Sequence, residues 1–433
     1  MASAKQQTKA GRTPAEPADP VDPAAEHGRL GPRPLPLHLA TAILTWQSSC
    51  AAWPLSRTGS LLWNPDLKPT AERLQRDLAD ADPEAFAQAL QRAVGNRVDA
   101  LMTGIERYHA HHYRRATPPP PITWQSGTTR LLDYGPRAST ADAVPLLVVP
   151  SLINRAYVLD LSERTSMMRY LARQGLRPFL VDWDAPGEAE RGFGLTDYVA
   201  GRLDDALHEV LRLTGKPPVV VGYCLGGLLA LALTVRRQRD VAGLALLATP
   251  WDFHADRSDH GALAIAWAAA MEPFLAATGE LPVDALQAMF ACLDPYLVPQ
   301  KFRAFAGTDP ASPQAETFVA VEDWLNDGVP LVAPVARELL RDWYGANATA
   351  RGAWRIAGDV VRPADIRVPS CVVLPAQDRI VPPASAAALA DALPNTHRLN
   401  PSAGHVGMIV GARARKAMWR PLADWTREAG AGG

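Results

Sequence analysis

The chain has 433 residues, of which 48% are hydrophobic and 21% charged, with 44 Lys and Arg against 45 Asp and Glu. This composition excludes a disordered chain, a collagen-like repeat and a cysteine-stapled miniprotein. The formal net charge of −1 gives no electrostatic footprint for nucleic acid or for an anionic membrane surface. The length fits one elaborated α/β domain or two smaller domains.

The N-terminal part of the chain is predicted to be a disordered tail followed by helices. Residues Met1 to Pro36 hold seven prolines and mixed charge without an apolar run, which is not the pattern of a secretory signal. A short polyproline segment, Pro118 to Pro121, predicts a boundary. From Leu37 to about Arg115 apolar residues recur at intervals of four or eight, a helical pattern carried by Leu74, Leu78, Phe86, Leu90 and Val94.

Beyond residue 121, short apolar runs alternate with amphipathic stretches, which is typical of a mostly parallel sheet covered by helices on both faces. We predict strands at Arg130–Tyr134, Pro145–Pro150, Pro178–Asp182, Pro218–Gly222, Gly243–Ala248, Ser370–Leu374 and Thr396–Leu399. We predict helices near Tyr157–Arg173, Leu195–Leu213, Leu225–Arg237 and Ser385–Leu393.

The longest uncharged stretch, Pro217 to Val235, is long enough to cross a membrane. The Gly-Tyr-Cys-Leu-Gly-Gly in its middle would break a spanning helix, whereas a buried strand, a tight turn and a buried helix use every residue. We therefore expect no integral membrane segment. Between Pro250 and about Asp359 the strand rhythm stops, and aromatic, helix-prone sequence predicts an inserted cap.

The four cysteines are scattered along the chain. They lie outside CxxC pairs and outside His clusters at metal-ligand spacing, which disfavours both a disulfide framework and a zinc site. This pattern fits a reducing, cytoplasmic setting, and we expect neither a metal nor a cofactor. Inert burial is the expectation for Cys50, Cys292 and Cys371.

The fourth cysteine, Cys224, lies in Val219-Val-Val-Gly-Tyr-Cys-Leu-Gly-Gly-Leu-Leu, where a strand runs into a helix. Glycines two residues before and two after it form the nucleophile-elbow pattern, with Cys in the position of Ser. Side chains at Gly222 or Gly226 would collide with the neighbouring strand and helix. The turn places the sulfur at a helix N-terminus, which favours a thiolate, so Cys224 is the candidate nucleophile; the alternative is a merely buried cysteine.

Two further residues have the order and spacing of a catalytic set. In an α/β-hydrolase the acid follows the nucleophile on a loop after a late strand, and the histidine comes last. Asp378 and His405 each follow one of the last two predicted strands. Asp182 and Asp252 also end predicted strands and stay open as alternative acids, or as carboxylates that cap loops.

An oxyanion site in this architecture is built from two backbone N–H groups. One is expected from Leu225, directly after the nucleophile. The other is expected from the loop after the strand Pro145–Pro150, where Ile153 is the first choice and Leu152 the alternative.

These residues resemble those of the polyhydroxyalkanoate (PHA) synthases, a family of the α/β-hydrolase superfamily. Gly222-Tyr-Cys-Leu-Gly-Gly is similar to the family's G-x-C-x-G-G box, and the resemblance covers roughly Trp124 to the C-terminus. The other similar segments are Pro150-Ser-Leu-Ile-Asn-Arg-Ala-Tyr-Val-Leu-Asp-Leu, Val181-Asp-Trp, Thr249-Pro-Trp-Asp-Phe, Asp323-Trp-Leu-Asn-Asp, Asp378-Arg-Ile-Val-Pro and Gly404-His-Val-Gly.

The motif spacing predicts three parts: a disordered tail over 1–36, a helical region with its Pro-rich boundary over 37–121, and an α/β-hydrolase domain over 122–433. The cap is expected as an insertion at about 250–359.

The resemblance implies a cytoplasmic acyltransferase at the surface of PHA granules, which polymerises (R)-3-hydroxyacyl-CoA into a polyester and releases CoA. The default monomer is 3-hydroxybutyryl-CoA. Cys224 would carry the acyl group and growing chain, His405 would be the general base, and Asp378 would orient His405 or help to activate the incoming hydroxyl. The expected partners are a second copy in a homodimer and a possible second synthase subunit. The alternatives are a cysteine thioesterase or intracellular PHA depolymerase of the same fold, and a non-catalytic granule-associated homologue.

Overall fold

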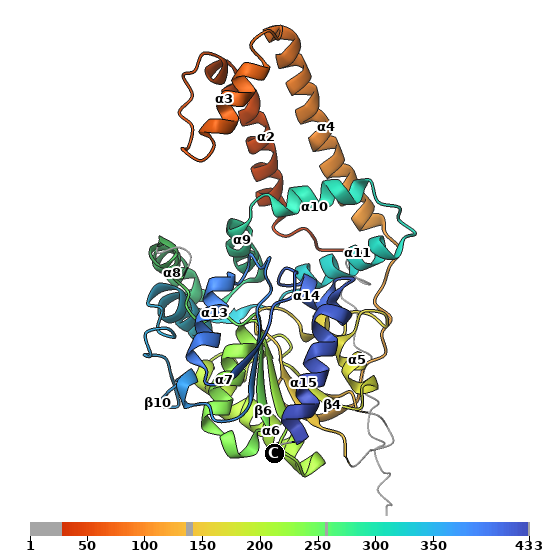
Figure 1. The fold of residues 1–433 in the computed structure, drawn as a ribbon, viewed down its shortest axis with the longest axis vertical. Coiled ribbons are helices and arrows are strands. Elements are labelled where there is room, and N and C mark those ends of the chain that lie inside the picture. The colour runs from red at the N-terminus through yellow and green to blue at the C-terminus, as the bar shows by residue number, and fades with distance from the viewer. Residues whose placement is uncertain (1–27, 136–141, 256–258, 432–433) are drawn as a thin grey trace, which may run out of the picture.

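The structure is a computed structural model that describes residues 28–135, 142–255 and 259–431. Within these residues the centre is a sheet of eight strands in the order β1-β2-β4-β3-β5-β6-β11-β12 (Figure 1). β1, β2 and β4 pair antiparallel, and the strands from β4 to β12 are parallel. The strands are β1 (Ile122–Ser126), β2 (Thr129–Asp133), β3 (Pro145–Val149), β4 (Arg177–Asp182), β5 (Val219–Tyr223), β6 (Gly243–Leu247), β11 (Ser370–Val373) and β12 (Thr396–Leu399).

The strands predicted from the sequence are all present in this sheet, with their ends shifted by one residue at most. The prediction missed β1, which follows the polyproline segment and pairs with β2 at the edge of the sheet. Its residues are exposed or half-buried. An edge strand of this kind lacks the continuous apolar run that marks the buried strands.

The two faces of the sheet are covered by different helices. Along β3, Leu147 and Val149 point into one core and Leu146 and Val148 into the other, as the two-residue period of a strand requires. The first core is closed by η2 (Asp197–Leu203), α6 (Asp204–Thr214), α7 (Leu225–Arg236) and α13 (Pro383–Ala392). The second core is closed by α5 (Met167–Arg173), α14 (Gly407–Val410), η6 (Arg415–Trp419) and α15 (Arg420–Ala431) (Figure 1).

The single helix predicted over Tyr157–Arg173 is wrong. The chain forms a short turn, η1 (Ala156–Leu159), and then the separate helix α5. Between them the Asp160 carboxylate is fully buried and accepts a hydrogen bond from Arg169 at 2.8 Å. Ser166 then caps the start of α5. This buried polar anchor interrupts the helix that apolar periodicity alone predicts.

An insertion between β6 and β11, which we call the cap, interrupts the alternation of strands and helices. It contributes residues to the same cleft as the end of β5, and so lies over the carboxyl ends of the parallel strands (Figure 1). Its helices are α8 (Asp259–Thr278), α9 (Val283–Leu293), α10 (Leu297–Ala306), α11 (Pro313–Asn326), α12 (Ala333–Arg337) and η4 (Glu338–Gly345). Two short strand pairs accompany them: β7 (Glu280–Leu281) with β8 (Leu331–Val332), and β9 (Arg355–Ile356) with β10 (Asp359–Val360).

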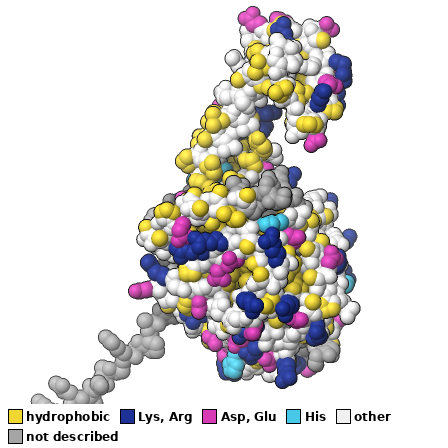
Figure 2. Space-filling model, turned by 90° about the vertical axis from the view of Figure 1, so that its left-hand side faces the viewer, with side chains coloured by type: hydrophobic (Ala, Val, Ile, Leu, Met, Phe, Trp, Pro, Cys, Tyr) yellow, Lys and Arg dark blue, Asp and Glu magenta, His cyan; other side chains and the backbone are white. Residues whose placement is uncertain are grey.

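Three helices before the sheet form an arm that projects from the body of the molecule (Figure 1). They are α2 (Leu35–Arg57), α3 (Lys68–Asp77) and α4 (Pro83–Ala110). The base of the arm packs on the cap, where Leu101, Ile105 and Tyr108 of α4 share a core with Phe302 and Phe305 of α10. Hydrophobic side chains lie exposed along the arm (Figure 2).

The segment before the arm, residues 28–34, is attached to the cap. The side chain of Arg29 is buried, pairs with Asp323 at 3.0 Å and donates to the carbonyl oxygens of His111 at 2.7 Å and Tyr113 at 2.6 Å. The prediction of disorder up to Pro36 is therefore wrong for residues 28–34. The sequence did not reveal this order because the residues that hold the segment lie far away along the chain. Residues 1–27 of the expected tail lie outside the described residues.

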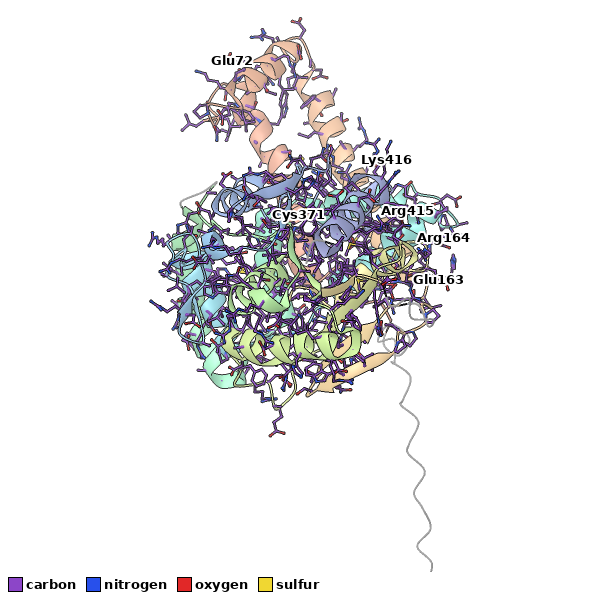
Figure 3. All side chains as sticks on the ribbon, turned by 60° about the horizontal axis from the view of Figure 1, so that its bottom comes forward. Glu72, Glu163, Arg164, Cys371, Arg415 and Lys416 are labelled. Atoms are coloured by element: carbon purple, nitrogen blue, oxygen red, sulfur yellow. The ribbon has the colours of Figure 1, made fainter. Side chains whose placement is uncertain are left out.

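The cysteines differ in their surroundings. Cys371 is buried inside β11 (Figure 3), Cys50 is half-buried in α2, and Cys292 is exposed on α9. The expected burial is therefore wrong for Cys292. Among the described helices, none combines the length and the apolar character needed to cross a bilayer.

Candidate active site

The predicted turn between strand and helix is present at Cys224. This residue joins β5 to α7 with a φ of 55° and a ψ of −130°, a conformation that side chains rarely adopt. A Cβ on Gly226 would collide with the carbonyl groups of Val149 and Pro150. At Gly222 a Cβ would collide with the start of α7. The glycines therefore allow strand and helix to approach closely enough to hold Cys224 in this strained turn.

Asp378 and His405 lie beside Cys224. His405 Nδ1 donates to Asp378 Oδ2 over 2.7 Å, and the imidazole also hydrogen-bonds the Cys224 side chain. The second carboxylate oxygen of Asp378 accepts from the backbone N–H groups of Ile380 and Val381, both at 2.9 Å. The acid is thus oriented by the loop after β11, and it orients the ring in turn. The structure brings the three predicted residues together, and their catalytic roles stay a prediction.

The charge state of the imidazole follows from these neighbours. Burial lowers the pKa of a histidine, but the Cys224 sulfur and the Asp378 carboxylate outweigh burial and raise the His405 pKa to about 10. Beside a Cys224 thiolate the ring therefore holds its proton at neutral pH. An imidazolium beside a cysteine favours its thiolate, which is the nucleophilic form.

The two alternative acids have other partners. Asp182 pairs with Arg130 at 2.8 Å at the end of β4. Asp252 accepts from Asn347 Nδ2 at 2.8 Å and from the His254 N–H at 2.9 Å. Both carboxylates therefore hold loops, as the alternative interpretation of these two residues predicts.

The two expected oxyanion donors differ in whether their backbone N–H groups are already hydrogen-bonded. Leu225 is the first residue of α7, where a backbone N–H has no acceptor within its own helix. The N–H of Ile153 donates to Ser151 Oγ at 3.2 Å, a long bond within its own loop. A substrate oxygen would have to displace or share that bond, so the assignment of Ile153 stays a prediction.

The sulfur of Cys224 faces a cleft of about 160 Å³ between the hydrolase core and the cap. Its walls are largely apolar, and they come from the elbow, the loop after β3, the histidine loop and the cap helices α9, α10 and α11. The cap supplies Phe290, Leu297, Val298 and Trp324 among others. Apolar walls of this kind disfavour water beside the sulfur.

Comparison with known proteins identifies the fold and the family. The model of the alpha/beta hydrolase fold matches residues 144–412, and that of the poly-beta-hydroxybutyrate polymerase (PhaC) N-terminus matches residues 84–171. The poly(3-hydroxyalkanoate) polymerase subunit PhaC of Haloferax mediterranei is 27% identical over 363 residues, 80% of this chain and 72% of that protein. The chain belongs to the PHA synthase family of the α/β-hydrolase superfamily.

Two further relatives carry the same name. The subunit of Allochromatium vinosum is 29% identical, covering 67% of this chain and 82% of that protein. The subunit of Synechocystis sp. is 25% identical, covering 80% of this chain and 90% of that protein. The predicted family and fold are thereby confirmed.

The wall of this synthase-family cleft includes residues that the sequence did not indicate. Pro32 and Arg33 from the segment before the arm, and His38 from α2, line the same cleft as Cys224. The backbone N–H of Arg33 donates to Asn326 Oδ1 of α11 at 2.8 Å. No local motif marks these residues, because they reach the cleft only through packing between distant segments.

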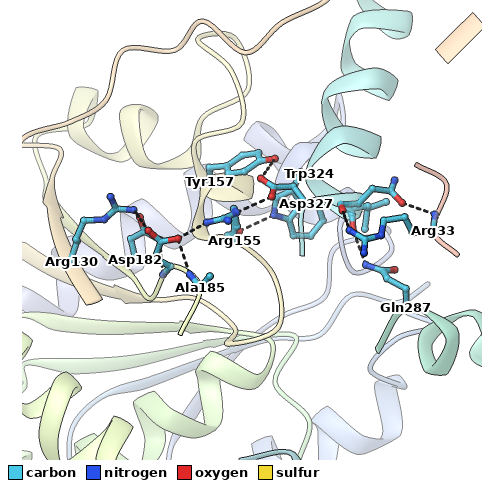
Figure 4. Close-up of polar contacts among 12 residues, drawn as sticks. Arg33, Arg130, Arg155, Tyr157, Asp182, Ala185, Gln287, Trp324 and Asp327 are labelled. Atoms are coloured by element: carbon cyan, nitrogen blue, oxygen red, sulfur yellow. Dashed lines mark hydrogen bonds and ion pairs between the residues drawn. The ribbon is translucent and has the colours of Figure 1, made fainter. Parts of the chain in front are cut away.

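A chain of ion pairs ties the loop after β3 to the cap (Figure 4). Arg155 donates to Asp184 at 2.6 Å and to Asp327 at 2.9 Å. Its carbonyl oxygen accepts from the indole of Trp324 at 2.8 Å, and Asn154 bridges to Gly328 of the cap. The loop that carries Ile153 is thus held by contacts on both of its sides.

Proposed function

We propose that the chain polymerises (R)-3-hydroxyacyl-CoA thioesters into a polyester and releases CoA, with Cys224 as the acylated residue. The observation that carries the proposal is a thiol on a strained elbow, hydrogen-bonded to an imidazole that Asp378 orients. Membership of the PHA synthase family and relatives named poly(3-hydroxyalkanoate) polymerase support the substrate class. The monomer we expect first is 3-hydroxybutyryl-CoA.

The first step is transfer of an acyl group to the enzyme. The Cys224 thiolate attacks the thioester carbonyl, and the developing oxyanion accepts from the N–H of Leu225 and of the loop at Ile153. The C–S bond to CoA then breaks, and the His405 imidazolium gives its proton to the departing CoA thiolate. One thioester replaces another, so the acyl group keeps its reactivity.

The second step is elongation. The hydroxyl of another hydroxyacyl group attacks the acyl carbon on Cys224 while neutral His405 takes its proton. An ester bond forms, the bond to sulfur breaks, and the cysteine leaves as the thiolate. Asp378 stabilises the imidazolium that forms. The apolar cleft under the cap favours attack by the alcohol over attack by water.

The test uses purified full-length protein and (R)-3-hydroxybutyryl-CoA. We expect CoA release together with turbidity from insoluble polymer, and mass spectrometry of the intact protein after brief exposure should find the acyl chain on Cys224. Cys224→Ala should abolish both signals, whereas Cys292→Ala, at the exposed cysteine of α9, should keep them. Free hydroxy acid as the sole product would identify a thioesterase or depolymerase instead. Unchanged granule formation by Cys224→Ala in cells would identify a non-catalytic homologue.

We also propose that the enzyme works as a homodimer at the surface of PHA granules in the cytoplasm, with a second synthase subunit as a further partner. The relatives' names as polymerase subunits support the second subunit. Size measurement of the purified protein, with and without substrate, tests the dimer. Fluorescence microscopy of a tagged chain tests the granule location.

A further inference from the structure

Tyr223 is the last residue of β5 and immediately precedes Cys224. Its side chain is buried, and its ring stacks on the His405 imidazole with centroids 5.2 Å apart and planes 28° apart. Its hydroxyl donates to the backbone carbonyl oxygen of His405 at 3.4 Å. One side chain on the elbow strand therefore contacts both the ring and the backbone of the histidine.

We propose that Tyr223 is a positioning residue that holds the His405 ring between Asp378 and Cys224 and stabilises its protonated form. The proposal rests on the role of His405 as the base in the proposed function. It goes beyond that function, because it assigns a part to the residue before the nucleophile, which the catalytic set does not include.

The physical basis is the attraction between a cation and the face of an aromatic ring, which extends to about 6 Å from the ring centroid and grows when the pair is desolvated. Burial raises the pKa of the Tyr223 phenol well above its usual range, and the nearby charges of Cys224 and Asp378 add to this. The phenol therefore stays neutral beside the imidazolium. The hydroxyl bond of 3.4 Å is long for an O–H donor, so the ring is the stronger contact.

The other groups around the pair come from three elements. Asp378 reaches His405 from the loop after β11, and Cys224 reaches it from the elbow. Tyr344 of η4 lies within the electrostatic influence of Cys224, and burial together with Cys224 raises its phenol pKa, so it too stays neutral. Arg379, beside Asp378 and in the cleft wall, is paired with Asp294 at 2.5 Å. Each of these groups is kept in the variants below.

Stabilising the imidazolium favours the thiolate and imidazolium over the thiol and neutral imidazole. Without the aromatic face, the thiolate should form only at higher pH. The onset of alkylation of Cys224 with rising pH reports this directly. It needs neither thioester nor polymer, so it is independent of whether the proposed synthase activity is correct.

The test measures iodoacetamide alkylation against pH in the full chain, following the Cys224 peptide by mass spectrometry because Cys50 and Cys292 are not fully buried. Tyr223→Phe keeps the ring and should keep the onset within 0.2 pH units, a margin of roughly twofold or less in rate. Tyr223→pentafluorophenylalanine keeps the size but reverses the ring's electrostatics, and Tyr223→Leu removes the ring. Both should raise the onset by about half a pH unit or more, roughly threefold slower alkylation on the acid limb.

The matched control is Tyr170→Leu, which removes a buried tyrosine that packs on Trp419, away from the cleft. Its onset should equal that of the unchanged protein. The same onset for Tyr223→Phe and Tyr223→pentafluorophenylalanine would overturn the proposal, and this near-isosteric pair decides the matter even where Tyr223→Leu fails to fold. With thioester substrate, Tyr223→Leu should lower kcat more than it changes KM. Absence of polymer from the unchanged protein would instead reject the proposed function and leave the alkylation result standing.

Discussion

The carboxylate of Asp378 uses both of its oxygens: one lies 2.7 Å from His405 Nδ1, and the other accepts hydrogen bonds from two backbone N–H groups of its own loop. The side chain is also fully buried, so a substrate hydroxyl could reach it only if the ring or the loop moved. Its position fits orientation of the ring better than direct contact with the acceptor alcohol.

Asp378→Asn separates these two roles. An amide in this place no longer stabilises the imidazolium and can hold the wrong tautomer, so we expect polymer formation to fall by about three to four orders of magnitude. If the acid serves only to orient the ring, acylation of Cys224 and elongation should fall equally. Rapid-quench measurement of Cys224 acylation beside polymer yield distinguishes the roles. Acylation that survives while elongation is lost would show that Asp378 acts mainly on the hydroxyl.

The sulfur of Cys224 is a main cause of the raised pKa of His405, so removing it should lower that pKa below about 10. Nitrogen-15 NMR of labelled histidine in Cys224→Ala measures the change directly, and an unchanged His405 titration would contradict the assigned cause.

The raised pKa of His405 also determines in which direction folding stability changes with pH. A pKa raised from the ordinary 6.5 to about 10 means that the folded state holds this proton more tightly than the unfolded state. The stabilisation from His405 is complete below about pH 6.5 and is lost as pH rises toward 10. Denaturant unfolding at pH 6.5, 8 and 10 measures the difference in unfolding free energy between the unchanged protein and His405→Gln. This difference should shrink as the pH rises. A difference in unfolding free energy that grows with pH would contradict this expectation.

The elbow glycines are predicted to be intolerant of any side chain. In Gly226→Ala the new methyl would meet backbone carbonyls that cannot move without shifting β3, so we expect a loss of about 2–4 kcal/mol in unfolding free energy together with loss of activity. Gly201→Ala in η2 is the matched control, because its added methyl meets nothing within 4 Å. Thermal unfolding of both variants provides the measurement. Equal stability of the two would refute the packing argument.

The loop after β3 depends on Arg155, whose guanidinium joins Asp184 of the core to Asp327 of the cap. Arg155→Lys keeps the charge but cannot span both carboxylates, because an ammonium is a point donor and the guanidinium is a fork. We expect kcat to fall about tenfold with a smaller change in KM, as the loop at Ile153 loses its fixed position. Arg164→Lys, at an exposed arginine of the body (Figure 3), is the control. A normal kcat in Arg155→Lys would show that the loop holds its geometry without this pair.

The elbow, the acid and the histidine were predictable because each is imposed locally. The glycines around Cys224, and the loops directly after two predicted strands, can be recognised in the sequence itself. The sequence could not predict that Pro32 and Arg33 line the cleft, because the short segment that holds them has the composition of a disordered tail. What orders it is the burial of Arg29 against Asp323, 294 residues further along the chain. Contacts between residues so far apart along the chain produce no periodic pattern or motif spacing in the sequence.

Arg29 should therefore control the wall of the cleft from a distance. Arg29→Met keeps much of the side-chain volume but removes the ion pair and the bonds to the His111 and Tyr113 carbonyl oxygens, so about 3–5 kcal/mol of local stability should be lost. Asp323 keeps its bond from Tyr108 at 2.8 Å, which limits the damage to the segment itself. Hydrogen exchange should rise in residues 28–34 and at the base of α4, with KM rising as Pro32 and Arg33 leave the cleft. Arg73→Met, at an exposed arginine of α3, should change neither, and protection of residues 28–34 that survives in Arg29→Met would show that Arg33 alone holds the segment.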